Sequence, residues 1–490
     1  MSKMEDKMSN NNLFKKFLDY AIGSGIVLIL GFVSSPLNTR LFSPDEFGKF
    51  SMFLLVGNVI NAIVLLGLDQ SFVRYFYIED EKNRGKLLYK TFKLSLIFCI
   101  FTTLLIVIFK EAFLQLISKN QSYQLLMLIG LNNFALLFNR FALLVVRMQQ
   151  KGKLFSALQV IQKITNIIVI LMLFFTTERN FLILAYAAVI SNIVATFIGV
   201  GAEKNLWSFK NSTGKINTSY RELLKYGYPL IFTFLITWLF QSSDRLFVKY
   251  YKGYEELGIY SAAFSIIALL NAVQMAFSMF WVPVAYEKFE NDSNSKSFFT
   301  QINQVVTFVM FSISVFIILF KDIIVLILGE SYRSASLIIP FLVFMPLMYT
   351  ISETTVLGIN FRKKSQYHIL IAVITAIINL IGHCIFVPKL GGIGAAISTG
   401  ITYIVFFSLR TLFSKKLYKN NYNLKAFYIV TFNLVLFSTY ATFNSINTPY
   451  ILLGAFNIIV LLFIYRKIIT NWFNYFYKNK KNLKRFTLKG

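Results

Sequence analysis

Two basic residues interrupt long apolar stretches, where a charge is costly. Arg140 stands within the run Leu136–Leu144, and Lys163 lies nine residues beyond Leu154. At the ~1.5 Å rise of a helix, Lys163 is roughly 13 Å into its stretch. Because a charge at the centre of a bilayer costs about 2.5 kcal/mol or more, both positions predict a polar cavity. A guanidinium and an ammonium group there would bind an anionic ligand such as a phosphate.

Three further arginines, Arg40, Arg74 and Arg245, lie nearer the ends of apolar stretches. Long basic side chains at such places can extend to the membrane surface and anchor a helix there. They can equally line the same anion-binding cavity, and both interpretations stay open. All five basic residues are therefore candidate substrate-binding residues.

Three acidic residues also fall in or beside apolar stretches, namely Asp69, Asp244 and Glu353. Asp69 precedes Arg74 by five residues, so a pair between them is conceivable though not ideal in a helix. A buried carboxylate can carry a proton, and we predict that these three residues couple transport to H⁺ or Na⁺. For Glu353 the alternative is a hydrogen bond to a neighbouring helix.

The cysteine and histidine content is not typical of a metal protein or of a disulfide-linked domain. The chain has two cysteines and two histidines, and their spacing forms neither a zinc site nor a disulfide framework. We predict no catalytic residues, no metal site and no cofactor apart from a coupled ion. The predicted loops are also too short to hold a catalytic domain, so the protein is expected not to be an enzyme.

The elements that must position these residues are membrane-spanning helices. The 490 residues are 56% hydrophobic and only 14% charged, with a mean hydropathy of +0.61, whereas soluble domains carry about 25% charged residues. A span needs about 20 mostly apolar residues. Fourteen segments qualify: 17–39, 50–73, 91–109, 123–146, 154–176, 181–202, 226–248, 258–284, 301–320, 336–360, 367–387, 392–413, 426–443 and 450–468.

The basic residues that produce the net charge of +27 are concentrated in the predicted loops and tails. With the N-terminus inside, the cytoplasmic segments hold 35 of the 49 Lys and Arg residues and the opposite loops hold 11. Basic residues collect on the cytoplasmic side of membrane proteins, so both termini are predicted to be cytoplasmic. The same bias explains the basic charge without a nucleic-acid partner.

The chain contains an internal repeat. A shift of 210 residues aligns Pro44–Ser51 with Tyr254–Ser261, and in both copies an acidic loop leads through a glycine into a span. Six spans separate the copies, so they share one membrane orientation, as in parallel transporter repeats. The fold class is an all-α polytopic membrane protein of about 14 transmembrane helices, with two six-helix lobes and two C-terminal helices. The predicted parts are an N-tail 1–16, lobes 17–202 and 226–413, a linker 203–225, two spans within 426–468 and a basic C-tail 469–490.

Amide side chains recur inside the spans. Most of them are expected to form hydrogen bonds between helices, and some could bind sugar hydroxyls if the cavity is hydrated. They are Asn58, Asn61, Asn132, Asn133, Asn166, Asn192, Asn271, Gln274 and Asn379.

Several segments resemble the polysaccharide transporters of the multidrug/oligosaccharidyl-lipid/polysaccharide (MOP) superfamily, the O-antigen and capsule repeat-unit flippases. The resemblance covers about residues 14–415. It rests on the order and spacing of Pro36–Phe42, Glu46–Gly48, Gly67–Phe76, Asp244–Arg245, Leu257–Ser261 and Val387–Ala396.

The resemblance implies a multidrug-exporter-like (MATE-like) fold whose two lobes alternate between inward-open and outward-open states. It implies a bacterial plasma-membrane protein that moves an undecaprenyl-diphosphate-linked oligosaccharide from the inner to the outer leaflet. Its partners would be that lipid-linked oligosaccharide, membrane lipids, a polysaccharide polymerase and a chain-length regulator. The repeat partner of Arg74 is Val284, so the two lobes need not share binding duties.

Three alternatives remain. A drug or cation exporter of the same superfamily would favour carboxylates in the path, whereas here the bases stand out. A lipid II flippase would differ mainly in the head group of its substrate. A membrane glycosyltransferase or polymerase is disfavoured because the predicted outward loops are short and poor in acids and bases.

Overall fold

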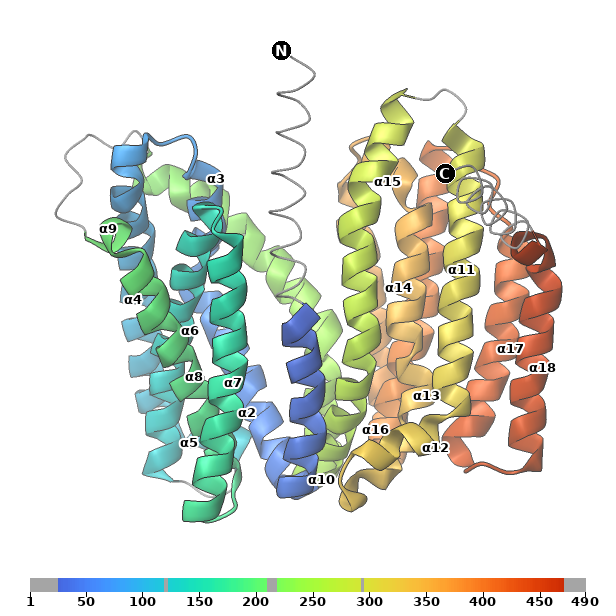
Figure 1. Cartoon of the computed structure of the whole chain (residues 1–490), viewed down its shortest axis with the longest axis horizontal. Coiled ribbons are helices and arrows are strands. Elements are labelled where there is room, and N and C mark those ends of the chain that lie inside the picture. The colour runs from blue at the N-terminus through green and yellow to red at the C-terminus, as the bar shows by residue number, and fades with distance from the viewer. Residues whose placement is uncertain (1–24, 119–121, 209–217, 292–294, 471–490) are drawn as a thin grey trace, which may run out of the picture. The chain divides into compact units, whose positions relative to one another are not determined.

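A computed structural model describes residues 25–118, 122–208, 218–291 and 295–470 (Figure 1). The regular elements in these ranges are all helices, and the predicted all-α class is confirmed. The predicted N-tail 1–16 and nearly all of the predicted C-tail 469–490 lie outside the described residues. The chain divides into unit 1, residues 1–245 with 253–261, and unit 2, residues 246–252 with 262–490.

Unit 1 contains the first helix, Gly25–Leu41, and a bundle of further helices. These are α2 (Pro44–Leu65), α3 (Leu68–Tyr75), η1 (Glu81–Asn83), α4 (Arg84–Ile108), α5 (Lys110–Ile117), α6 (Tyr123–Met148), α7 (Gly152–Thr176), α8 (Phe181–Ala202), α9 (Lys204–Trp207) and part of α10 (Tyr220–Asn291). Unit 2 holds the rest of α10 and the remaining helices. These are α11 (Ser295–Leu319), α12 (Lys321–Ile324), η2 (Val325–Ile327), η3 (Glu330–Leu337), α13 (Ile339–Leu342), α14 (Phe344–Thr355), α15 (Leu357–Phe361), α16 (Gln366–Leu417), α17 (Leu424–Phe443) and α18 (Thr448–Ile464).

Long apolar helices run through both units within the described residues. Nine helices are long and apolar enough to cross a membrane. Two of them, α10 and α16, are each broken at a glycine with non-helical geometry, Gly253 and Gly391, so each makes two crossings. A bent pair, η3 with α13 and α14, and two shorter helices, the first helix and α18, add three more. Among the described residues, nine helices, or ten with the bent pair, thus meet this criterion, and the fourteen predicted spans are reached when each broken helix counts twice and the two shorter helices are added.

Amide hydrogen bonds between helices stabilise unit 1. Asn133 Nδ2 lies 3.0 Å from both Thr102 Oγ1 and Thr103 Oγ1, which links α6 to α4. Gln162 Nε2 of α7 donates to Asn192 Oδ1 of α8 at 2.6 Å. The hydrogen bonds predicted between helices are therefore present at Asn133 and Asn192. They are favourable because a buried amide without a partner costs free energy in an apolar setting.

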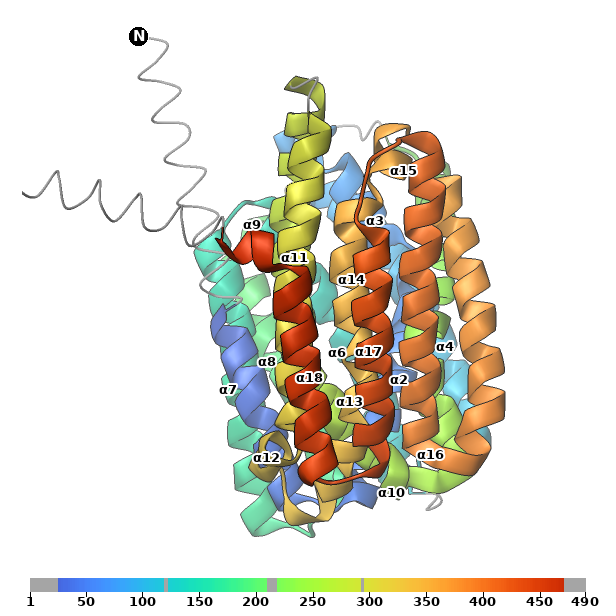
Figure 2. The same cartoon turned by 90° about the vertical axis from the view of Figure 1, so that its right-hand side faces the viewer.

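In unit 2 the crossings pack around α14 and α16. Helix α14 lies against α16 and α11, and α17 and α18 lie side by side (Figure 2). The break in α16 follows from its sequence: Pro388 cannot donate a backbone hydrogen bond, and Gly391 adopts φ 58°, ψ −132°. The predicted spans 367–387 and 392–413 are thus two arms of one broken helix.

The aligned copies of the repeat meet inside unit 1. A Cβ on Gly48 would lie 1.8 Å from the carbonyl oxygen of Tyr254, and a Cβ on Gly258 would lie 1.9 Å from that of Pro44. Pro44 and Tyr254 are 210 residues apart, as are Gly48 and Gly258. The 2.7 Å hydrogen bond between the hydroxyls of Ser51 and Ser261 joins a third such pair. The contact is therefore reciprocal, as expected where two copies of a repeat pack symmetrically.

Candidate functional site

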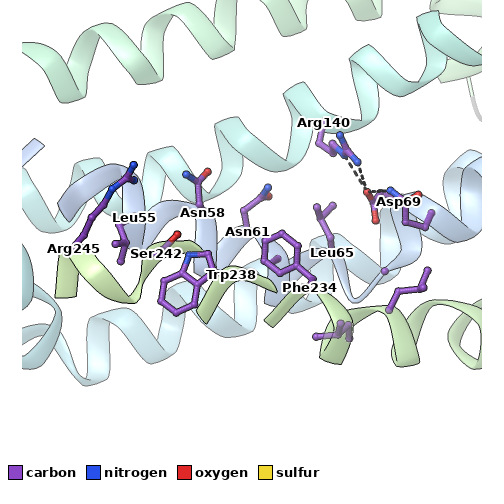
Figure 3. A pocket seen from close by; sticks show the side chains of 15 residues that line it. Leu55, Asn58, Asn61, Leu65, Asp69, Arg140, Phe234, Trp238, Ser242 and Arg245 are labelled. Carbon is purple, nitrogen blue, oxygen red and sulfur yellow. Dashed lines mark hydrogen bonds and ion pairs between the residues drawn. The ribbon is translucent and has the colours of Figure 1, made fainter. Parts of the chain in front are cut away.

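A cavity of about 470 Å³ lies within unit 1. Its wall comes from α2, α3, α6 and the part of α10 before Gly253. The lining residues are Leu55, Asn58, Asn61, Ala62, Leu65, Gly67, Asp69, Gln70, Arg140, Leu230, Ile231, Phe234, Trp238, Ser242 and Arg245 (Figure 3). The residues from α2 and from α10 recur every three or four positions, so each helix presents one face to the cavity.

A break between α2 and α3 brings Asp69 to the cavity. Leu66 and Gly67 both have a left-handed backbone, with φ 48° and 68°. A side chain at Gly67 would be doubly unfavourable, because its Cβ would also lie 2.2 Å from the carbonyl oxygen of Gly227. Helix α3 therefore restarts at Leu68, and Asp69 falls in its first turn, where the helix dipole favours a negative charge.

Asp69 forms an ion pair with Arg140. Its Oδ2 atom lies 2.6 Å from Arg140 Nη2, 3.1 Å from Arg140 Nε and 2.9 Å from Gln70 Nε2. The Asp69 side chain is 8% exposed and that of Arg140 is 40% exposed. The carboxylate is thus held in the wall while the guanidinium reaches the open volume. The pair between Asp69 and Arg74 considered from the sequence is not formed, because Arg74 ends α3 on its exposed side.

Arg245 lies at the other end of the cavity from Arg140 (Figure 3). Its neighbour Asp244 is buried, accepts a hydrogen bond from the Tyr260 hydroxyl, and accepts another from the Arg245 backbone N–H at 2.8 Å. The Asp244 carboxylate is therefore engaged away from the cavity wall. The charged groups that line the cavity are two guanidinium groups and one carboxylate, which leaves a net positive charge.

The other predicted basic residues do not line this cavity. Lys163 is half-buried on α7, whereas Arg40, in the last turn of the first helix, and Arg74 are exposed. The structure thus brings Arg140, Arg245 and Asp69 together and leaves Lys163, Arg40 and Arg74 outside. Their part in binding stays a prediction.

The third predicted acidic residue, Glu353, lies in unit 2 and is paired. Its Oε1 is 2.8 Å from Arg410 Nη2, and Arg410 Nη1 donates to Ser352 Oγ at 2.5 Å. Both charged side chains are less than 10% exposed. Arg410 falls within the predicted span 392–413, and α16 continues past it to Leu417 and buries Arg410 against α14. The alternative of a bond from Glu353 to a neighbouring helix is confirmed.

The aromatic part of the cavity was missed from the sequence. Phe234 and Trp238 were not singled out, because 17% of the chain is aromatic and single positions do not stand out. Their spacing of four, continued by Ser242 and by Arg245 three residues later, is the signal that could have identified this face of α10. Within the described residues, no group of three or more His, Cys, Asp or Glu side chains could hold a metal ion.

Residues 13–289 match the family model described as "polysaccharide biosynthesis protein". No curated protein sequence matches the chain.

Solved transporter structures share the fold. The lipid II flippase MurJ in an inward closed conformation is 17% identical with a TM-score of 0.68, covering 93% of this chain and 98% of that one. An inward-facing multidrug resistance MATE family transporter of the MOP superfamily is 15% identical with a TM-score of 0.61, covering 80% and 94%. A MOP superfamily transporter from Pyrococcus furiosus is 16% identical with a TM-score of 0.54, covering 83% and 97%. The fold of this multi-pass membrane protein is therefore that of MOP superfamily transporters.

Proposed function

This chain belongs to the polysaccharide biosynthesis protein family, and on that premise we propose that it is a flippase for a lipid-linked oligosaccharide. The substrate is an undecaprenyl-diphosphate-linked repeat unit of O-antigen, capsule or exopolysaccharide. The protein moves it from the inner to the outer leaflet of the bacterial plasma membrane. It acts as a transporter and catalyses no covalent step.

The observation that carries the proposal is the cavity in unit 1. Arg140 and Arg245 offer planar guanidinium groups, which match phosphate oxygens better than an ammonium group does. The cavity wall carries two guanidinium groups and one carboxylate, so a diphosphate entering the cavity meets more basic than acidic groups. The surrounding apolar helices strengthen this attraction because charges are poorly screened away from water.

The transport cycle follows alternating access between inward-open and outward-open states. We propose that Asp69, Asp244 and Glu353 couple this cycle to H⁺ or Na⁺. Each has a partner that protonation would release, namely Arg140, Tyr260 and Arg410 respectively. Both termini lie in the cytoplasm, and a polysaccharide polymerase and a chain-length regulator act on the delivered substrate.

Complementation tests the proposal. A strain that lacks its own repeat-unit flippase, but makes the native glycan of this protein, should regain surface polysaccharide when the wild-type chain is expressed. Arg140→Ala and Arg245→Ala at matched expression should not restore it. An expressed wild-type chain that fails with its native glycan pathway would contradict the proposal.

The second candidate function is that of a lipid II flippase. The fold of one such protein matches this chain over 93% of its length. The two functions separate in a strain depleted of its lipid II flippase. Growth rescue there, without restoration of surface polysaccharide in the first strain, would favour the second candidate.

A further inference from the structure

Two amide side chains in the cavity wall have no hydrogen-bond partner within the described part of the chain. Asn61 Oδ1 is buried and accepts no hydrogen bond. Asn58, one helical turn earlier on α2, is exposed to the cavity. An unsatisfied amide in an apolar segment is costly, by about 1–3 kcal/mol from mutational data. The buried Asn61 oxygen therefore favours a polar occupant of the cavity, and the exposed Asn58 amide can contact the same occupant.

The two asparagines are the in-span asparagines of unit 1 that line the cavity. Asn133, Asn139 and Asn192 each hydrogen-bond to a neighbouring helix. Packing between helices therefore accounts for those three residues but not for Asn58 and Asn61. Because Asn58 and Asn61 are three residues apart, their amides share one face of α2.

Aromatic residues line the same stretch of the cavity. Phe234 and Trp238 come from α10, and they lie with Asn58 and Asn61 between the Arg245 end and the Arg140–Asp69 end (Figure 3). The Phe234 ring is 44% exposed although it belongs to an apolar helix. A pyranose ring has hydroxyl groups that amides can bind as donors and acceptors, and it has C–H faces that an aromatic ring can cover. A wall with amides on one side and aromatic rings on the other therefore suits such a ring. The volume of about 470 Å³ lies within the 300–1,000 Å³ of typical ligand pockets.

Resting on the proposed function, we infer that Asn58, Asn61 and Trp238 form a sugar subsite for the residue attached to the diphosphate. The arginines hold the phosphates, and the Asn61 amide hydrogen-bonds a hydroxyl or acetamido group of the first sugar. Trp238 covers the apolar face of that sugar. The cavity thus distinguishes a glycosylated carrier lipid from the bare carrier.

Binding of defined probes to the purified full-length protein tests this inference. The probes are a polyprenyl diphosphate with no sugar, the same lipid bearing one hexose, and the same lipid bearing one N-acetylhexosamine. The wild type should bind at least one sugar-bearing probe about tenfold more tightly than the bare diphosphate, the effect of satisfying one buried amide. Asn61→Leu should bring that ratio close to one by weakening the binding of the sugar-bearing probes more than that of the bare probe.

Asn433→Leu is the matched control. Asn433 lies in the apolar helix α17 of unit 2 and donates to the Ile429 carbonyl oxygen, so this variant makes the same chemical change away from the cavity. It should keep the wild-type ratio. Trp238→Leu should also lower the ratio, which tests the aromatic side of the subsite.

The remaining outcomes separate the subsite from the proposed function. If the wild type binds all three probes equally, the sugar subsite is refuted while lipid-diphosphate binding stands. If Asn61→Leu weakens all three probes by the same factor, Asn61 supports the fold and does not recognise the sugar. If the wild type binds none of the probes, the proposed function itself fails.

Discussion

At the scale of single residues, the Asp69–Arg140 pair combines a buried carboxylate with a guanidinium that is 40% exposed. Arg140→Ala should lower transport about tenfold or more, because a charged hydrogen bond to phosphate is worth about 1.5–3 kcal/mol. It should also lower stability, since it leaves Asp69 without its partner. That loss should fall between the ~1 kcal/mol of an exposed pair and the ~3–5 kcal/mol of a buried one. Thermal unfolding and transport at matched expression measure the two effects.

The double variant Arg140→Ala with Asp69→Asn separates these effects. It removes both charges, so it should recover most of the lost stability and none of the transport. Recovery of transport along with stability would mean that Arg140 acts only by neutralising Asp69. Lys163→Ala, a basic position in a span but outside the cavity, tests whether the cationic wall extends to α7.

For the buried pair of Glu353 and Arg410 we predict a larger loss of stability when one partner is removed. Both side chains are almost fully buried, so Arg410→Ala alone should cost about 3–5 kcal/mol of unfolding free energy. Replacing the pair by Glu353→Leu with Arg410→Met should restore the midpoint of thermal unfolding to near the wild-type value, because apolar pairs often substitute for buried ion pairs. If this stable double variant transports normally, Glu353 has no part in ion coupling.

At the scale of helices, the reciprocal contact of Gly48 with Gly258 leaves no room for a side chain. Gly48→Ala and Gly258→Ala should each force Pro44 and Tyr254 apart and lower both stability and transport. Gly31→Ala is the control, since nothing lies within 4 Å of a Cβ at that position of the first helix. Unchanged unfolding and transport in Gly48→Ala would refute the close approach.

The hydroxyls of Ser51 and Ser261 provide a crosslinking test of the same contact. Their oxygens are 2.7 Å apart, so Ser51→Cys with Ser261→Cys, in a Cys384→Ser background, should form a disulfide under mild oxidation. Ser51 belongs to the predicted lobe 17–202 and Ser261 to the predicted lobe 226–413, so alternating access between these lobes predicts that the bond stops transport and that a reductant restores it. Continued transport by fully crosslinked protein would contradict that model.

Much of the helical framework could be predicted because apolar length and charged boundaries are local properties of the sequence. The crossing count and the repeat follow from them. Asp69 pairs with Arg140, which is 71 positions away in the sequence. This pairing depends on the backbone turn at Gly67 from which α3 restarts, and a local sequence pattern does not indicate which distant residue Asp69 will meet. The burial of Arg410 is hard to predict for a similar reason: lysines follow it closely, so its stretch resembles the end of a span although α16 continues.

At the scale of the whole molecule, the fourteen crossings and the excess of basic residues on one side predict cytoplasmic termini. Fusions at each terminus check this: a fluorescent protein that matures only in the cytoplasm should be bright. An alkaline phosphatase that is active only outside the cytoplasm should be inactive. The opposite result at either end would require a different number or orientation of crossings.

The proposed function is the movement of a lipid-linked oligosaccharide between the two leaflets. The most direct test is reconstitution of the purified chain into liposomes that contain a polyprenyl-diphosphate oligosaccharide, followed over time by a glycan-modifying enzyme added outside. We predict that wild-type protein exposes inner-leaflet substrate to the enzyme, and that Arg140→Ala and Arg245→Ala vesicles expose no more than protein-free ones. Equal protection of the inner pool in wild-type and protein-free vesicles, with folded protein present and a coupling ion gradient imposed, would contradict the account.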